Sequence, residues 1–253
     1  MQTSSHPIWC WALGPTYIKA RARKAWVPSS VFAPAAAVVD YYHCRNVAFF
    51  PGDERYTAEH FEAVAQYDQV LAQVYHLTET GKERAKDVSQ LSQHQPNLIG
   101  GIVDDFSTAI SRGEGLPEDI RLLAENLKSE NAALDLHAVC YTMHFDVDLC
   151  PFLPYIDYIS LWVWDPADLV DLDTHIAEAT RRYHKPMHLG LYLFDYGVTG
   201  EAMPIETLVF QCERARQYYH DGRIQGIHIL GSYTNDEFNT EQAKWLADYC
   251  QSF

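Results

Sequence analysis

Short apolar runs alternate with helical stretches along this chain from Ile8 to Phe253. β-Branched or aromatic residues dominate each run, and the apolar residues of the stretches between them recur every three or four positions. This alternation is typical of a parallel sheet wrapped by helices. The expected strands number eight, at residues 8–13, 47–50, 70–75, 99–106, 134–141, 158–164, 188–194 and 227–231. Expected helices include residues 82–94, 118–129, 167–184, 205–219 and 237–251.

Eight strands in 253 residues fit a closed barrel, which takes about 250 residues as one domain. We therefore predict an α/β fold, a single (β/α)8 TIM barrel whose one domain spans residues 1–253. Helix starts are indicated at Thr57 with Glu59 and His60, at Pro117, and at Asp165 with Pro166. No internal repeat, low-complexity tract or domain linker interrupts the pattern.

Residues 14–34 are predicted to form a long first βα loop. The segment is rich in Ala, Pro, Lys and Arg, and long loops of this kind are often lids or binding loops. It carries four cations within six residues, Lys19, Arg21, Arg23 and Lys24. Charge runs usually lie on solvated loops, and the alternative is a patch that closes over a carboxylate or sulfate of the ligand.

The charge of the chain limits its partners. The net charge is −15 and the pI is about 5.1, which argues against nucleic acid or an anionic membrane, because both require a basic face. No apolar run approaches the roughly 20 residues that cross a bilayer. We expect a soluble, acidic protein that binds a small-molecule or oligosaccharide ligand. It would be cytoplasmic as read, or extracytoplasmic if a signal peptide has been removed.

The six cysteines are scattered, with no C-x-x-C pair and no spacing typical of a zinc site. We expect them to be small buried hydrophobic residues, and we predict no cofactor and no metal. The chain also lacks G-x-G-x-x-G, the P-loop G-x-x-x-x-G-K-[ST], the G-x-S-x-G elbow and H-E-x-x-H.

Alternation along a strand tells which side chains enter a barrel, and residues at the carboxyl ends of its strands meet the ligand. In residues 158–164, Ser160, Trp162 and Trp164 share a face opposite Leu161 and Val163, and we expect that face to point inward. Trp9 and Trp11 share a face of the first strand in the same way. Flat rings at a strand end suit a half-wet binding site, although core packing is an equally good reading of Trp162.

Two adjacent acids end the fourth predicted strand, Asp104 and Asp105. Buried carboxylates are costly unless they are paired or used, so two of them need partners or a task. A helix cap formed near Ser107 and Thr108 would account for one Asp but not for both.

The seventh predicted strand places His188, Gly190, Tyr192 and Phe194 inside the barrel, with Asp195, Tyr196 and Gly197 at its exit. Asp195 would then lie where barrel enzymes keep catalytic groups. The alternative is that Asp195 caps a helix or closes a turn.

The fifth strand contributes His137 and Tyr141 on one face, and the eighth contributes His228. A lone inward histidine is more often a satisfied core residue than a base or a ligand, so we expect these two histidines to have supporting roles.

Paired carboxylates and an aromatic platform are what glycoside hydrolysis requires. We expect Asp105 to be the acid/base or water-orienting carboxylate, Asp104 to support it, and Asp195 to be the second carboxylate. Tyr141, Tyr192 and His137 would hydrogen-bond to sugar hydroxyls, and Trp residues would stack on the rings. The predicted binding set is Trp11, His137, Tyr141, Trp162, Trp164, Tyr192, Tyr196 and His228.

The segments Ile102-Val-Asp-Asp-Phe106, Leu161-Trp-Val-Trp-Asp165 and Leu193-Phe-Asp-Tyr-Gly197 resemble those of uncharacterised bacterial barrel proteins of a glycoside-hydrolase-like family. The resemblance runs from Trp9 to the C-terminus. It implies the barrel fold, a carbohydrate-type ligand and an Asp-lined mouth.

Two other functions remain open. One is a metal-dependent sugar isomerase or epimerase, with Asp104, Asp105, His137 and His228 as possible ligands. The other is a carbohydrate-binding barrel without catalysis that grips a glycan with Trp11, Trp162 and Trp164. Neither the fourth nor the seventh strand ends in Glu, which counts against both the hydrolase and the isomerase.

Overall fold

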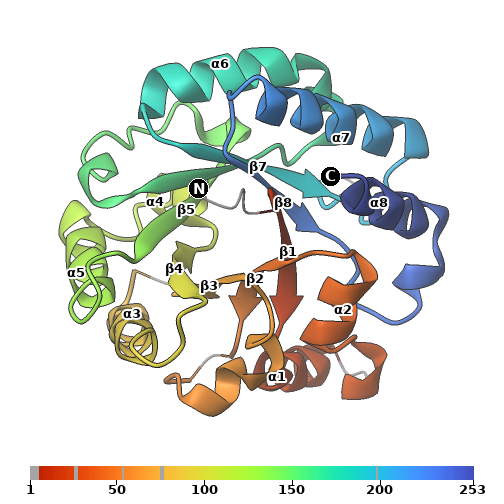
Figure 1. Ribbon diagram of the computed structural model, residues 1–253. Helices are drawn as coiled ribbons and strands as arrows, with labels where there is room; N and C mark the ends of the chain where they lie inside the picture. The colour runs from red at the N-terminus through yellow and green to blue at the C-terminus, as the bar shows by residue number, and fades with distance from the viewer. Residues whose placement is uncertain (1–5, 26–27, 53, 75–76, 198) are drawn as a thin grey trace.

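The computed structural model describes residues 6–25, 28–52, 54–74, 77–197 and 199–253. Eight parallel strands close into a barrel in chain order, which confirms the predicted (β/α)8 fold (Figure 1). The strands are β1 (Ile8–Leu13), β2 (Asn46–Phe50), β3 (Gln69–Gln73), β4 (Leu98–Val103), β5 (Asp135–Tyr141), β6 (Tyr158–Trp162), β7 (Met187–Tyr192) and β8 (Gly226–Leu230). Each overlaps a predicted run, and residue 75 of the third run lies outside the described residues.

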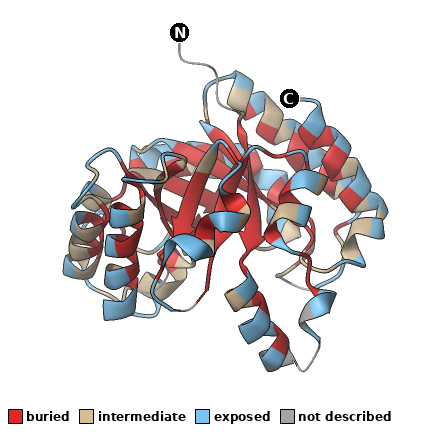
Figure 2. Ribbon diagram, turned by 60° about the horizontal axis from the view of Figure 1, so that its bottom comes forward, coloured by how far each residue is buried: buried red, intermediate tan, exposed pale blue. Residues whose placement is uncertain are grey.

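Helices ring the barrel, with their inner faces buried and their outer faces exposed (Figures 1 and 2). They are α1 (Pro15–Ala25), α2 (Ala35–Tyr41), α3 (Glu79–Leu91), α4 (Phe106–Ser111), α5 (Pro117–Leu127), α6 (Leu172–Tyr183), α7 (Ile205–His220) and α8 (Glu241–Gln251). Short 3-10 turns complete the connections: η1 (Ser29–Val31), η2 (Ala58–Val64), η3 (Thr142–His144), η4 (Leu153–Tyr155), η5 (Pro166–Asp171) and η6 (Glu237–Asn239). No helix in the described ranges is long and apolar enough to cross a membrane.

The three expected helix starts are confirmed, but those at Thr57 and Asp165 begin 3-10 turns rather than α-helices. Pro117 is the first residue of α5, and the Asp165 carboxylate accepts a 2.9 Å hydrogen bond from the Ala167 N–H at the start of η5. Thr57 precedes a 3-10 turn rather than an α-helix. The predicted helices 167–184 and 237–251 likewise begin with the 3-10 turns η5 and η6.

Residues 14–34 form the long connection from β1 to α2, as predicted, but the segment is not irregular. Most of the segment is helical, because α1 begins at Pro15 and is followed by η1. Proline suits the first helical position, and Ala, Lys and Arg are strong helix formers, so the composition of this segment is also that of an exposed helix. Ile18 and Ala22, four residues apart, are the buried face that holds α1 in place.

All six cysteines are free thiols. Five are buried, as expected, whereas Cys150 is exposed.

The inward rows of the barrel follow the predicted alternation. Trp162 packs on Tyr192 with ring centroids 4.7 Å apart, and its indole covers Gly190 so closely that a Cβ there would lie 1.9 Å from the ring. A side chain at position 190 would therefore displace Trp162. Glycine on β7 is what allows a tryptophan from β6 to lie flat across the barrel interior.

Candidate active site at the mouth of the barrel

A cavity of about 190 Å³ opens at the carboxyl ends of the strands. Aromatic side chains form most of its wall, and the two acids that follow β4 provide its carboxyl groups. The lining residues are Trp11, Leu13, Tyr17, Arg21, Phe50, Asp104, Asp105, Val139, Tyr141, Trp162, Trp164, Tyr192, Tyr196, Leu230 and Tyr233. The structure thus brings eight members of the predicted site together around one cavity. They are Trp11, Asp104, Asp105, Tyr141, Trp162, Trp164, Tyr192 and Tyr196.

Asp105 stands in an unusual backbone conformation. Its φ of 50° and ψ of 26° place it in the left-handed region, immediately before α4. Few residues other than glycine adopt this region, Asp and Asn most readily among them, and such positions cluster at functional sites. The Asp105 carbonyl oxygen accepts a hydrogen bond from the Ala109 N–H in the first turn of α4. The Asp105 carboxylate forms no capping hydrogen bond with that helix.

Asp104 is held beside Asp105. The Asp104 Oδ1 accepts the Asp105 backbone N–H at 2.9 Å. Burial, together with the negative charge of Asp105, raises the pKa of the Asp104 carboxyl to about 7. A substantial fraction of Asp104 is therefore protonated at neutral pH and is able to donate a proton.

Tyr141 fixes the orientation of the Asp105 carboxylate. Its hydroxyl donates a 2.7 Å hydrogen bond to Asp105 Oδ1, and burial raises the pKa of the phenol well above its ordinary value, so the hydroxyl keeps its proton. Tyr141 is itself anchored, because its backbone N–H donates to Ser107 Oγ at 3.0 Å. The Ser107 hydroxyl in turn lies 3.0 Å from His144 Nδ1. The start of α4 and the end of β5 are thereby tied together around the carboxylate.

The aromatic wall is continuous around the cavity. Trp11 packs edge-on against Trp162, with ring centroids 5.6 Å apart. Trp164 meets Tyr141 and Tyr192 at nearly right angles, with centroids 5.6 and 5.9 Å away. Rings in these arrangements are mutually supported, so the wall keeps its shape without a ligand.

Asp195 does not take the predicted place. Its carboxylate accepts hydrogen bonds from the Thr199 N–H at 3.2 Å and the Thr199 hydroxyl at 3.0 Å, within the turn that follows β7. Asp195 is not among the described residues that line the mouth cavity. Gly197, two residues after Asp195, packs closely on Trp164, since a Cβ at position 197 would lie 2.6 Å from the Trp164 carbonyl oxygen. It does not direct the Asp195 carboxylate toward the mouth. The turn that we kept as the alternative is the one observed.

His137 and His228 also lie away from the predicted ligand surface. They are buried beneath the cavity, with His188 beside them, and neither is among its described lining residues. Each is the third residue of its strand, two or more positions before the carboxyl end. A sugar isomerase would need Asp104, Asp105, His137 and His228 around one metal ion. The two acids line the cavity, whereas the two histidines lie in the barrel interior below it.

Other residues that line the cavity were not in the predicted site set, although Arg21 belongs to the basic segment that we considered as a patch for an acidic ligand group. Tyr17 and Arg21 come from α1, and Tyr233 follows β8. The Arg21 guanidinium lies 5.4 Å from the centre of the Tyr233 ring, in the range of a cation–π contact. Of the basic segment, Lys19 and Arg23 are exposed and do not line the cavity, and the side chain of Lys24 lies outside the described residues. Helical spacing from Tyr17 to Arg21 was the signal that could have revealed this pair.

A second cavity of about 130 Å³ shares Asp104 and Asp105 with the first. It lies on the side of β3 and α4, where Leu77, Thr108 and Arg112 help to line it. The two carboxyl groups thus stand at the junction of two hollows. Such a position suits groups that act on a bond joining two units of a ligand.

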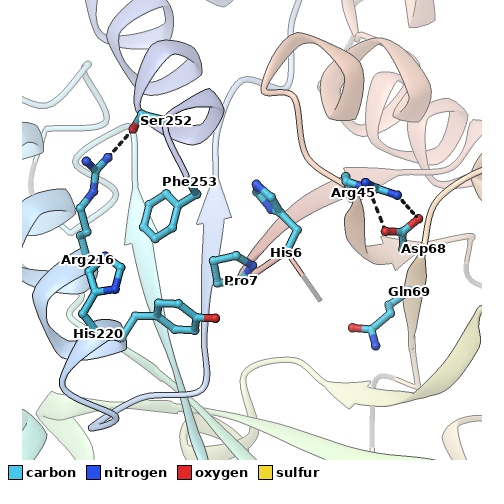
Figure 3. A pocket seen from close by; sticks show the side chains of 10 residues that line it. His6, Pro7, Arg45, Asp68, Gln69, Arg216, His220, Ser252 and Phe253 are labelled. Carbon is cyan, nitrogen blue, oxygen red and sulfur yellow. Dashed lines mark hydrogen bonds and ion pairs between the residues drawn. The ribbon is translucent and has the colours of Figure 1, made fainter. Parts of the chain in front are cut away.

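A larger hollow, of about 870 Å³, lies at the opposite end of the barrel. Figure 3 shows Arg45 joined to Asp68 on one side of it and Arg216 joined to Ser252 on the other, with His6 and Pro7 between them. Arg45 and Asp68 form an ion pair there, whereas Arg216 donates to the Ser252 hydroxyl. Since ligands of (β/α)8 barrels meet the carboxyl ends of the strands, we assign the candidate site to the mouth despite its smaller volume.

No protein-family model matches the chain, and no curated protein matches its sequence. Its fold is similar to that of a GH128 (subgroup I) endo-beta-1,3-glucanase from Amycolatopsis mediterranei, with a TM-score of 0.56 at 14% identity over 96% of this chain and 100% of that chain. A beta-D-glucuronidase of Dictyoglomus thermophilum gives a TM-score of 0.56 at 13% identity over 86% of this chain and 46% of that one. A family 18 chitinase from Crocus vernus gives 0.51 at 11% identity, over 97% and 98%.

These likenesses concern the fold. The chain has the barrel architecture of known glycoside hydrolases, as the sequence resemblance implied. It matches less than half the length of the glucuronidase and the full length of the glucanase. At such low identities the residues of the site must be judged by their own chemistry.

Proposed function

We propose that this protein hydrolyses glycosidic bonds, with Asp104 as the general acid and Asp105 as the carboxylate that orients the attacking water. The observation that carries the proposal is the pair itself: two carboxyl groups in one aromatic-walled cavity, one with its pKa raised to about 7 and the other hydrogen-bonded to Tyr141. Carboxyl groups in environments that separate their roles in this way are suited to acid and base assignments.

One of the two carboxyl groups donates a proton and the other accepts one during each turnover. Asp104 gives its proton to the glycosidic oxygen as the bond between that oxygen and the anomeric carbon breaks. Water adds to the anomeric carbon, and its proton passes to Asp105. Exchange with solvent then returns the proton to Asp104. General acid–base help of this kind contributes about 10²–10⁴-fold in rate.

The aromatic wall supports a carbohydrate as the ligand. Trp11, Trp162 and Trp164 offer flat apolar faces, and the Tyr192 and Tyr196 hydroxyls are candidates for hydrogen bonds to the sugar. Sugars bury one apolar face and keep a rim of hydroxyls, which is the pattern that such a wall accommodates. The glucanase and the chitinase of similar fold bear names that describe action on polysaccharides, which agrees with this assignment.

Arg21 adds a positive charge to the rim of an otherwise acidic site. It lies among the lining residues, over the Tyr233 ring. We assign it to an acidic substituent of the sugar, such as a carboxylate or sulfate. The other cations of this segment have no part in the proposal.

The test is turnover of a panel of aryl glycosides and oligosaccharides by the wild-type protein and by Asp104→Asn. We expect hydrolysis of at least one member by wild type and a loss of about 10²-fold or more in the variant. Asp195→Asn is the matched control, because its carboxylate serves a turn and not the cavity. Binding of a sugar without turnover by wild type would instead identify a non-catalytic carbohydrate-binding barrel. Equal losses in the two variants would overturn the assignment of Asp104.

A further inference from the structure

Three buried histidines meet inside the barrel, below the mouth cavity. They come from three strands, His137 from β5, His188 from β7 and His228 from β8. Each offers a ring nitrogen, and these three nitrogens lie within 4.8 Å of one another. The proposed hydrolysis uses none of the three.

We propose that His137, His188 and His228 form a binding site for a divalent transition-metal ion of the zinc type. Imidazole nitrogen is a preferred ligand of Zn²⁺ and of similar ions, and three histidines with a water as fourth ligand make a complete tetrahedral set. This site goes beyond the proposed function, and it revises our expectation from the sequence that the chain holds no metal.

The distances between the rings are close to those of a formed site. The His188 Nδ1 and His228 Nε2 atoms are 3.1 Å apart and share a hydrogen bond. Two nitrogens on one tetrahedral zinc ion lie about 3.3 Å apart, so a bound ion would replace this hydrogen bond with little movement of the rings. The centroids of His188 are 4.9 Å from His228 and 5.2 Å from His137, against about 5.2 Å for two imidazoles on one zinc ion. The pair His137 and His228 is wider, at 6.4 Å, so the His137 ring would move inward by about 1 Å.

His137 presents an unused donor atom. Its Nδ1 is buried and has no hydrogen-bond partner among the described residues, and the residue is only 2% exposed. Buried polar atoms are nearly always satisfied, so an orphan beside two other imidazoles indicates a missing partner. A metal ion bound through this nitrogen would supply that partner.

The surroundings hold the rings as metal ligands require. His228 Nδ1 lies 2.8 Å from Ser160 Oγ, which also accepts the Trp162 indole N–H at 2.8 Å. If His228 binds the ion through Nε2, its Nδ1–H donates to Ser160, which is the outer contact that orients ligating histidines. Trp9 packs against all three rings, with centroids 5.8 to 6.5 Å away, and shields the site from solvent.

The experiment loads the wild-type protein with Co²⁺, removes loose metal on a chelating resin, and measures bound cobalt and visible absorption. We expect one Co²⁺ per chain and the strong visible bands of a tetrahedral nitrogen-ligated ion. His188→Gln should lose both, whereas His94→Gln, a change at an exposed histidine, should keep both. Retention of the bands in His188→Gln, or bound cobalt that His94→Gln removes, would contradict the site.

A measurement on the wild-type protein alone covers the case in which His188→Gln does not fold. X-ray absorption of the zinc-loaded protein should show scattering from three imidazoles with nitrogen at about 2.0 Å. Sulfur ligands, an oxygen-only shell or no retained zinc would overturn the proposal. None of these readouts depends on turnover, so the metal site and the proposed hydrolysis can fail independently.

Discussion

The Tyr141 hydroxyl donates a 2.7 Å hydrogen bond to Asp105 Oδ1, and this bond joins the end of β5 to the left-handed residue that precedes α4. It orients a carboxylate toward the mouth cavity at a point where the backbone is itself unfavourable. The geometry is costly for folding, and this cost agrees with the catalytic task that we propose for Asp105.

Tyr141→Phe removes this hydrogen bond and keeps the ring. We expect kcat/KM on a cleaved glycoside to fall about 10- to 100-fold, because the Asp105 carboxylate loses its orienting donor. Most of the loss should appear in kcat, since the aromatic wall that binds the sugar is unchanged. The matched control is Tyr219→Phe, at the opposite end of the barrel, which should leave both constants unaltered. Equal constants for Tyr141→Phe and wild type would show that Tyr141 has only a packing role.

Asp104→Asn should stabilise the protein at alkaline pH while it removes turnover. The folded-state pKa of about 7 lies above the ordinary aspartate value of 3.8, so the Asp104 contribution to stability is fully present below pH 3.8 and is lost as the pH rises through 7. The shift corresponds to at most about 4 kcal/mol, which contact with solvent reduces to about 2 kcal/mol. Guanidinium unfolding at pH 8 should therefore favour the variant, and at pH 3.5 the two proteins should be nearly equal. A variant less stable than wild type at pH 8 would mean that Asp104 is ionised and well paired.

Gly190→Ala tests how the wall of the cavity is built. The added methyl would lie 1.9 Å from the Trp162 ring, so Trp162 would have to leave its packing against Trp11 and Tyr192. We expect a loss of about 3 kcal/mol in unfolding free energy and a changed near-ultraviolet circular dichroism spectrum. Gly113→Ala, where the methyl meets nothing within 4 Å but φ is +73°, should cost about 1 kcal/mol and leave that spectrum intact. Similar losses of unfolding free energy in both variants would show that Trp162 can shift to accommodate a methyl group at position 190.

Arg21→Gln tests the assignment of an acidic sugar. Calorimetry should show that the variant binds a uronic acid glycoside about 10-fold more weakly than wild type does, with a salt dependence that has nearly vanished. Binding of the neutral glycoside with the same skeleton should be unchanged. Lys19→Gln removes an exposed charge from the same helix outside the cavity and serves as the control. If neutral and acidic sugars lose affinity equally, Arg21 acts through packing on Tyr233.

The sequence predicted the fold and the inward rows correctly, because both depend on periodicity. The alternation that separates Trp162 and Tyr192 from the aliphatic residues beside them follows from a strand's repeat of two residues. This repeat does not show whether an inward side chain lies at the mouth of the barrel or deeper along its axis. His137 and His228 face inward as predicted, yet they lie below the cavity, because only the last positions of each strand reach the mouth.

The remaining differences arise where one backbone turn decides the outcome. Asp195 and Asp105 both follow a strand, but Asp195 closes a turn with Thr199, whereas the left-handed conformation of Asp105 presents its carboxylate to the cavity. Residue types alone do not distinguish these two cases. The basic segment was misjudged for a related reason, because its composition suits either a solvated loop or an exposed helix, and only the burial of Ile18 and Ala22 decides between them.

The most direct test of the central claim is a crystal structure of Asp104→Asn with an oligosaccharide that the wild-type protein cleaves. We predict that the sugar spans the two hollows beside Asp105, that one ring packs on Trp162 or Trp164, and that the glycosidic oxygen lies within hydrogen-bond distance of residue 104. A sugar held elsewhere, or one whose glycosidic oxygen lies out of reach of residues 104 and 105, would contradict the account.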